Sequence, residues 1–157
     1  MDDRAAGLGE VRIAAAGPFD LKVLAALHAA CFEDAWDESA IAAMMAMPGA
    51  FGLLAVTDAA PAGFLLARVA ADEAEILSFG VLPECRRQGI GGHLLGAAQA
   101  RAAAEGAHRV FLEVAEDNLP ARALYLRCGF AVVGRRPAYY RRAGRPPAAA
   151  LVMAKPS

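Results

Sequence analysis

Two arginines and three glycines gather between a predicted strand and a predicted helix. The segment reads Arg86, Arg87, Gln88, Gly89, Ile90, Gly91 and Gly92. Backbone N–H groups in the first turn of a helix lack intrahelical partners and lie at the positive end of the helix dipole. Glycines allow a phosphate group to approach that backbone closely, and arginines add charge-assisted hydrogen bonds. The segment therefore predicts a site for a ligand that carries a diphosphate.

Two common nucleotide-binding motifs match this turn poorly. A GxxxxGK[ST] phosphate loop needs a lysine after its glycines, and none follows here, which disfavours nucleoside triphosphate hydrolysis. The dinucleotide fingerprint GxGxxG is matched by Gly89 and Gly91 but has Leu94 in place of its third glycine. A tight strand-to-helix turn without any ligand is the remaining alternative.

Hydrophobic periodicity and turn residues place this segment in an alternating order of strands and helices. We expect strands at residues 11–16, 51–57, 63–71, 75–81, 109–115, 130–134 and 149–154. We expect helices from residue 18, over 37–47, over 89–105, and between Asn118, a suitable N-cap, and Gly129. An Arg-, Pro- and Gly-rich loop would join the last two strands. The order predicts one mixed α/β domain over residues 1–157, with a central sheet of six to seven strands flanked by about four helices.

The overall charge and the histidines exclude several functions. The 157 residues carry 16 Lys and Arg against 17 Asp and Glu, a net charge of −1. Non-specific nucleic-acid binding needs a surplus of cations, so we expect no direct nucleic-acid partner. The three histidines show no metal-ligand spacing, so we expect no metal.

The cysteines and the apolar segments bear on location. Cys31, Cys85 and Cys128 are odd in number and far apart, which indicates packing thiols in a reducing cytoplasm. The N-terminus lacks the basic and apolar regions of a signal peptide. Pro48 and Gly49 divide the longest uncharged segment into a helix and a strand. We therefore expect a cytoplasmic protein without a membrane span.

Two separated motifs resemble the GNAT superfamily of acyl-CoA-dependent N-acetyltransferases. Residues 86–91, Arg-Arg-Gln-Gly-Ile-Gly, match its R/Q-x-x-G-x-G/A signature, whose loop holds the pyrophosphate of coenzyme A. Residues 118–130 match its second signature, which begins at Asn118 and includes Ala121 and Tyr125. The resemblance extends to the predicted element order, and it implies the GNAT fold with acetyl-CoA as co-substrate.

The same resemblance implies where the pantetheine arm lies. The arm would follow the strand of Phe79, Gly80 and Val81, with β-type hydrogen bonds to its backbone and a further contact to Asn118. Gly80 would leave room for this approach. Because a ligand inserted between two strands replaces their pairing, we expect the strands of Val81 and Glu113 to splay apart.

Within the superfamily, the chain is similar to RimI-type enzymes, which acetylate the N-terminal alanine of a small-subunit ribosomal protein. The likeness rests on short segments, among them Leu112-Glu113-Val114, Trp36 after the first helix, and Tyr139-Tyr140. It implies a protein or peptide N-terminus as the acceptor, with Trp36, Tyr139 and Tyr140 as candidate acceptor-binding residues.

Acyl transfer from a thioester to an amine needs a group that removes a proton from the ammonium and a group that protonates the departing thiolate. Glu113 is the sole acid in the apolar strand at residues 110–114, and we assign it as the general base. Tyr125 follows Asn118 by seven positions, two turns along one helix face, and we assign it as the general acid. A surface carboxylate and a core aromatic are the alternative interpretations.

Two other functions stay open at this level. The acceptor could be a small-molecule amine, or the domain could bind acyl-CoA without catalysis. We expect direct transfer in a ternary complex, because Cys128 lacks the paired histidine that a nucleophilic thiol needs. The arginines between positions 135 and 145 are interpreted as a solvated loop.

Overall fold

The computed structural model describes residues 9–58, 60–142 and 144–157. Its strands are β1 Val11–Ala16, β2 Ala50–Thr57, β3 Ala60–Ala70, β4 Glu73–Val81, β5 Arg109–Ala115, β6 Ala131–Arg142 and β7 Arg145–Pro156. Its α-helices are α1 Leu21–Cys31, α2 Glu38–Met45, α3 Ile90–Ala104 and α4 Leu119–Arg127. Short 3₁₀-helices at Pro18–Asp20 and Pro83–Cys85 precede α1 and α3. The predicted mixed α/β fold, with six to seven strands and about four helices, is confirmed.

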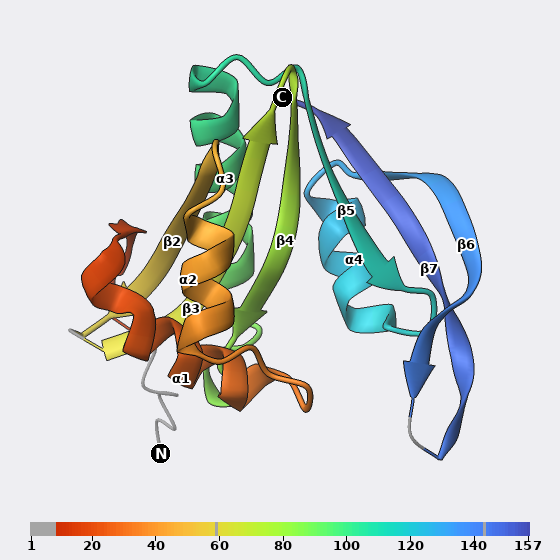
Figure 1. Ribbon diagram of the computed structural model, residues 1–157, viewed down its shortest axis with the longest axis horizontal. Coiled ribbons are helices and arrows are strands. Elements are labelled where there is room, and N and C mark those ends of the chain that lie inside the picture. Colours follow the sequence, from red (N-terminus) through yellow and green to blue (C-terminus); the bar gives the residue numbers. More distant parts are fainter. Residues whose placement is uncertain (1–8, 59, 143) are drawn as a thin grey trace, which may run out of the picture.

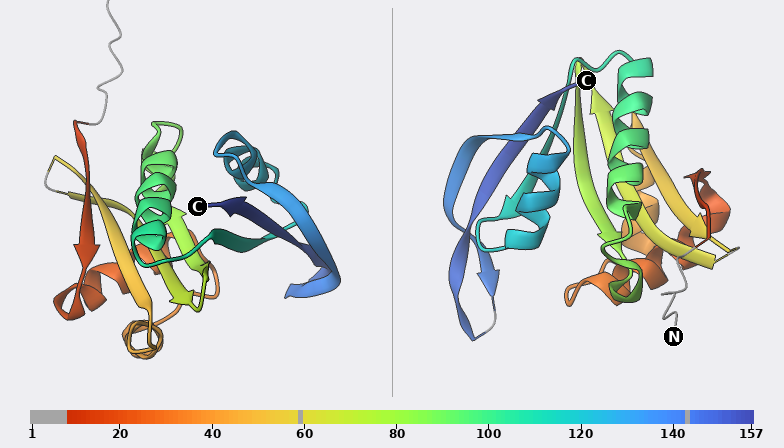
Figure 2. Two further views of the ribbon diagram at one scale, coloured as in Figure 1. Left: turned by 90° about the horizontal axis from the view of Figure 1, so that it is seen from above. Right: turned by 180° about the vertical axis from the view of Figure 1, so that it is seen from behind.

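One seven-stranded mixed sheet, in the order β1-β2-β3-β4-β5-β7-β6, organises the molecule. Only β4 and β5 pair in parallel; the other neighbours are antiparallel. Helices α1 and α2 cover one face of the sheet, and α3 and α4 lie on the opposite face (Figures 1 and 2). Each face therefore has its own apolar core.

The parallel pair β4–β5 opens along its length, as predicted. Its register runs only from Glu73 opposite Arg109 to Ile76 opposite Leu112. Beyond that point the two strands diverge into a V-shaped gap (Figure 1). On the other side of β4, the register with β3 shifts around Leu77, which marks a β-bulge where the divergence begins.

Local capping signals fix the helix that lies beside this gap. The Asn118 side chain accepts a hydrogen bond from the N–H of Ala121 at 3.3 Å, which confirms the predicted N-cap of α4. Gly129 follows the helix with φ +91°, and Lys155 Nζ donates to the Cys128 carbonyl oxygen at 2.6 Å. Both ends of α4 are therefore held by specific contacts.

The segment predicted as an Arg-, Pro- and Gly-rich loop is instead a long hairpin. Strand β6 continues to Arg142, and β7 begins at Arg145 and runs back beside it. Because β6 is an edge strand, it tolerates the charges and the proline that suggested a loop. Register shifts along the hairpin bend it toward the start of α4.

Two further findings bear on the sequence predictions. Cys31, Cys85 and Cys128 are free thiols, as expected. In the described parts of the chain, no helix combines the length and the apolar character needed to cross a membrane.

Two glycine variants test the packing of the turn between α2 and β2 against β3. Gly49 has φ +80°, and a Cβ there would collide with the carbonyl oxygen of Val69. We expect Gly49→Ala to lower the free energy of unfolding by about 2 kcal/mol in urea denaturation. Gly96 on α3 faces open space, so Gly96→Ala should leave stability unchanged or raise it slightly. Equal stability of both variants would contradict this packing.

Candidate active site

The Arg- and Gly-rich turn lies open at the end of β4. After the 3₁₀-helix at Pro83–Cys85, Arg87 adopts φ +63° and Gly89 φ +82°, and α3 begins at Ile90. Ile90 is buried and anchors the helix, whereas residues 86–89 are exposed. Arg86 Nε donates to the Val81 carbonyl oxygen at 3.0 Å, which ties the turn to the strand that precedes it. The first-turn N–H groups of α3 are therefore presented at an accessible corner.

The glycines of this region differ in what surrounds them. No atom of the described residues lies within 4 Å of a Cβ built at Gly92. At Gly91 such a Cβ would lie 3.0 Å from Leu124 Cδ2 and 3.3 Å from Phe79 Cζ. The absence of a side chain at Gly91 therefore serves close packing of α3 against α4 and β4, which differs from the reason that we expected, the close approach of a diphosphate.

We expected Gly80 to leave room for the pantetheine arm, and this prediction is wrong. A Cβ at Gly80 would lie 2.9 Å from Cys31 Sγ and 3.0 Å from Phe64 Cε1. The space beside this glycine is thus used by α1 and β3, and is not left free for a ligand. The backbone edge of β4 that faces the gap is the part that a pantetheine arm can use.

Tyr125 lies on the α3–α4 side of the gap. Its side chain is buried, with ring centroids 6.1 Å from Phe79 on β4 and 5.9 Å from Phe130. Burial raises the pKa of Tyr125, and the nearby Tyr140 adds to the shift. The phenol therefore stays protonated at neutral pH, which is the form that a general acid needs.

Glu113 points to the opposite face of the sheet. Its neighbours Leu112 and Val114 are buried in the core beneath α3 and α4, so the alternation of β5 places Glu113 on the opposite face, where, among the described residues, the apolar core beneath α1 and α2 includes none from β5. The side chain is 19% exposed, and its Oε1 lies 3.2 Å from Arg136 Nη1 on β6. The carboxylate is therefore partly desolvated but has a cationic partner.

The β6–β7 hairpin brings both predicted tyrosines to this carboxylate. Burial raises the pKa of Tyr140, and the charge of Glu113 raises it further. Tyr139 packs edge-on against Tyr140 at 5.3 Å, and the Arg136 guanidinium lies over the Tyr139 ring. A chain of contacts thus runs from Glu113 through Arg136 and Tyr139 to Tyr140.

Sequence reasoning missed a second carboxylate, Glu75. Its Cα lies opposite Phe111 in the parallel register. Phe111 precedes Glu113 by two residues, so Glu75 and Glu113 lie on the same face of the sheet. Burial raises the pKa of Glu75, and the charge of Glu113 raises it further, against opposing effects of Arg136 and Arg68. Glu75 also lines a small cavity of about 140 Å³. The alternation of β4 could have placed Glu75 on one face, but its nearness to Glu113 depends on the register.

These features match a known family. The model of the acetyltransferase (GNAT) family matches residues 21–130. The chain belongs to this family. Among solved structures, the ribosomal-protein-S18-alanine N-acetyltransferase of Escherichia coli is similar over 94% of each chain, with a TM-score of 0.86 and 26% identity. The predicted family and the predicted likeness to RimI-type enzymes are confirmed.

Other relatives of this GNAT protein differ in how much they share with it. A Bacillus subtilis protein, provisionally named a ribosomal protein bS18-alanine N-acetyltransferase, is 30% identical over 115 residues, 73% of this chain and 76% of the relative. Mycothiol acetyltransferase of Clavibacter michiganensis is 42% identical over 69 residues, which is 44% of this chain but only 22% of that protein. NAA60 of Arabidopsis thaliana, solved with acetyl-CoA, has a TM-score of 0.81 at 20% identity over 94% of this chain and 98% of its own.

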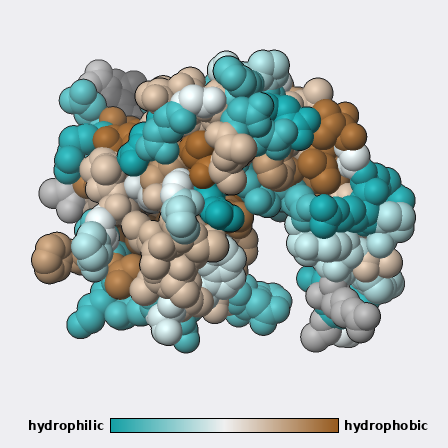
Figure 3. Space-filling view, turned by 45° about the horizontal axis from the view of Figure 1, so that its top comes forward, coloured by the Kyte–Doolittle hydropathy of each residue, from teal (hydrophilic) through white to brown (hydrophobic). Residues whose placement is uncertain are grey.

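Trp36 stands on the other side of the gap from the two tyrosines. It lies in the α1–α2 connection, and its ring stacks on His28 at 5.0 Å and 17°. The connection and the β6–β7 hairpin flank the opening, and the molecular surface is hollowed between them (Figures 1 and 3). The three predicted acceptor residues thus border one hollow without forming one cluster.

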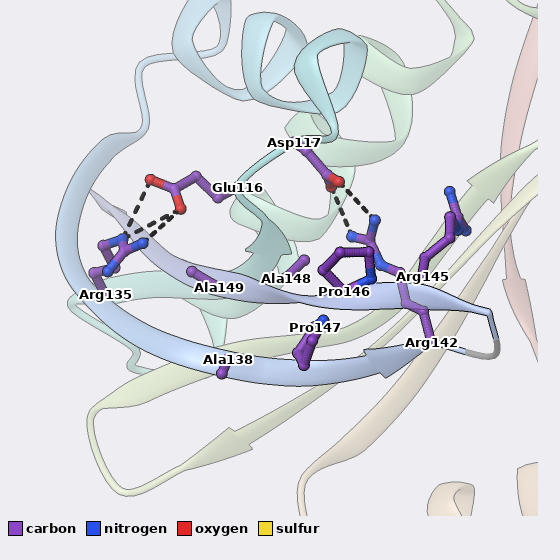
Figure 4. A pocket seen from close by; sticks show the side chains of 10 residues that line it. All are labelled: Glu116, Asp117, Arg135, Ala138, Arg142, Arg145, Pro146, Pro147, Ala148 and Ala149. Atoms are coloured by element: carbon purple, nitrogen blue, oxygen red, sulfur yellow. Dashed lines mark hydrogen bonds and ion pairs between the residues drawn. The ribbon is translucent and has the colours of Figure 1, made fainter.

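Arginines of the hairpin take part in ion pairs, whereas we expected only a solvated loop. Arg135 pairs with Glu116 at 2.9 Å, and Arg142 pairs with Asp117 at 2.6 Å. These pairs lower the pKa values of both carboxyl groups. They cross a cavity of about 570 Å³ between the hairpin and the start of α4 (Figure 4). Their geometric role is to hold the hairpin to the β5–α4 junction.

No metal centre emerges among the described side chains, in which no group of three or more His, Cys, Asp or Glu residues is placed to hold an ion.

The buried imidazole of His28 predicts a pH dependence of stability. Burial lowers its pKa below the ordinary value of 6.5. Between the lowered pKa and 6.5 the unfolded chain binds more protons than the folded one, so the free energy of unfolding falls as the pH drops through this range. We expect urea denaturation between about pH 7.5 and pH 5 to show a weaker pH dependence for His28→Gln than for the parent. The exposed control His108→Gln should keep the parent's dependence, and a His28→Gln profile parallel to the parent's would contradict the prediction.

Proposed function

We propose that this GNAT acetyltransferase transfers the acetyl group of acetyl-CoA to a protein N-terminus, with the N-terminal alanine of a ribosomal protein as its acceptor. The observation that carries the proposal is the gap that opens between β4 and β5 beyond Ile76 and Leu112. Glu113 is the next residue of β5, and Tyr125 packs against Phe79 of β4. The names of the Escherichia coli and Bacillus subtilis relatives support this acceptor. A ribosomal acceptor and free thiols are consistent with a cytoplasmic site of action.

The residues along the gap fit the coenzyme. The turn of residues 86–92 offers helix N–H groups and two arginines for the diphosphate, with open space beside Gly92. The backbone of Phe79–Val81 would hold the pantetheine arm, with Asn118 at the start of α4 close to it. When bound, acetyl-CoA supplies an activated thioester.

The two proton transfers of the reaction use residues on opposite faces of the sheet. Glu113 accepts the proton of the acceptor ammonium, directly or through a water. An N-terminal amine has an ordinary pKa of about 7.7 to 8.0, far below the value of about 10.4 for lysine, so one carboxylate suffices. Tyr125, which burial keeps protonated, donates a proton to the departing sulfur. Transfer is direct, because Cys128 ends α4 without a histidine activating it in its motif.

Variants of the two proposed catalytic residues test this assignment. With acetyl-CoA and a peptide that starts with alanine, we expect Glu113→Gln and Tyr125→Phe each to lower kcat by about 100-fold or more. Glu105→Gln at the exposed end of α3 is the control and should keep the parent's rate. Thiol release is the measurement.

Four outcomes would contradict the proposal. Parent-like turnover by both variants would refute the assigned roles. A loss confined to Glu75→Gln would transfer the role of base to Glu75. Turnover with free amines but not with peptides would indicate a small-molecule acceptor, and binding of acetyl-CoA without turnover would indicate a non-catalytic module.

A pair of glycine variants on α3 tests the diphosphate site. Among the described residues, none has an atom within 4 Å of a Cβ built at Gly92 or at Gly96, so valine is accommodated at both positions. Only Gly92 lies in the first turn of the helix. We expect Gly92→Val to raise the Kd of acetyl-CoA about tenfold in calorimetry, because its side chain occupies the diphosphate's place. Gly96→Val should bind like the parent, and equal affinity of both variants would remove the turn from the site.

A further inference from the structure

We propose that His28 is a positioning residue that fixes the acceptor loop, the α1–α2 connection around Trp36, against the coenzyme strand β4. The proposal rests on the proposed function, in which Trp36 borders the acceptor and β4 holds the pantetheine arm. His28 itself lies outside the catalytic group around Glu113 and Tyr125. His28 contacts both the acceptor loop and β4 through hydrogen bonds of its ring.

Both ring nitrogens of His28 are engaged. Nδ1 accepts a hydrogen bond from the backbone N–H of Trp36 at 3.0 Å. Because an accepting nitrogen carries no proton, the neutral ring is protonated at Nε2, which donates to Ser78 Oγ at 2.9 Å. One imidazole therefore bridges the acceptor loop and β4.

Aromatic packing holds the ring in this orientation. The His28 side chain is 3% exposed and lies among Phe32, Trp36 and Phe64, with centroid distances of 4.6, 5.0 and 5.4 Å. Burial in these surroundings lowers the pKa of His28, so the neutral form prevails at neutral pH. A neutral and immobile ring is what two directional hydrogen bonds require.

The Ser78 contact falls at a critical point of β4. Ser78 directly follows the bulge around Leu77, where β4 leaves β5, and directly precedes Phe79. A bond at this position fixes the direction of the strand as it enters the gap. His28 thus acts on the strand segment to which we assign the pantetheine arm.

The Trp36 contact fixes the acceptor loop near its α2 end. The loop is anchored at its ends, where the Phe32 N–H bonds to the His28 carbonyl oxygen and the Asp37 side chain caps α2 by accepting from Ala40. Between these anchors, His28 holds Trp36 through both its backbone N–H and its ring. The distance between Trp36 and the coenzyme strand is therefore set through one side chain.

Two substitutions separate the hydrogen bonds of His28. In His28→Asn the side-chain oxygen can take the place of Nδ1 and accept from Trp36, but it does not reach Ser78. In His28→Gln the side-chain amide can take the place of Nε2 and donate to Ser78, but it leaves the Trp36 N–H without its acceptor. We expect His28→Gln to raise the KM of an alanine-starting peptide about tenfold, with the Kd of acetyl-CoA unchanged. His28→Asn should keep the peptide KM close to the parent value.

Ser78→Ala provides a second variant that does not alter the histidine. It removes the bond to β4 and leaves the Trp36 bond in place. We expect it to raise the Kd of acetyl-CoA about threefold with little change in the peptide KM. A shift of the peptide KM alone in this variant would overturn the bridging role.

Fluorescence gives a readout that does not depend on catalysis, because Trp36 is the sole tryptophan of the chain. We expect His28→Gln to shift the Trp36 emission to longer wavelength and to lower its anisotropy, whereas His28→Asn stays close to the parent. If the parent acetylates the peptide while both His28 variants match each other in KM and in emission, the positioning role is wrong. If neither the parent nor any variant turns over the peptide, but the emission of His28→Gln still differs from that of His28→Asn, the positioning of the loop is supported and the proposed acceptor is wrong.

Discussion

The short parallel pairing of β4 with β5 is the constraint on which the site depends. Hydrogen bonding joins the strands only up to Ile76 and Leu112, although both continue. Beyond that point β4 stays paired with β3, and only its backbone groups that face the gap lack a partner among the described strands. An extended ligand can supply such partners, and the exposed turn at the end of β4 is where its anionic part would bind.

The two sides of the gap between β4 and β5 differ in their chemical surroundings. Helices α3 and α4 close one side of the gap, where Tyr125 is buried and stays protonated. On the opposite face, Glu75 on β4 and Glu113 on β5 lie beside each other, and in the part of the chain that the structure describes the apolar core beneath α1 and α2 includes no residue of β5. The proposed proton donor Tyr125 and the proposed proton acceptor Glu113 thus lie on opposite faces of the sheet.

Local features of the site were readable from the sequence, and features that depend on register or on distant partners were not. The turn before α3, the Asn118 cap and the inward–outward alternation around Glu113 all follow from neighbouring residues. Glu75 could not be placed beside Glu113, because no local signal gives the register of a parallel pair. The hairpin looked like a loop, because the acids that neutralise Arg135 and Arg142 lie some twenty positions away in the chain. The hydrogen bond of His28 to Ser78 could not be predicted, because the two residues are fifty positions apart.

The central claim is that a CoA thioester occupies the gap along β4, and hydrogen exchange tests it most directly. The backbone amides of residues 77–81 should exchange more slowly when saturating acetyl-CoA is added, because the pantetheine arm and its hydrogen bonds shield the strand edge. The amides at Ala74 and Val110, in the paired part of the two strands, should be far less affected. Unchanged exchange at residues 77–81, under conditions in which calorimetry shows the coenzyme bound, would contradict the account.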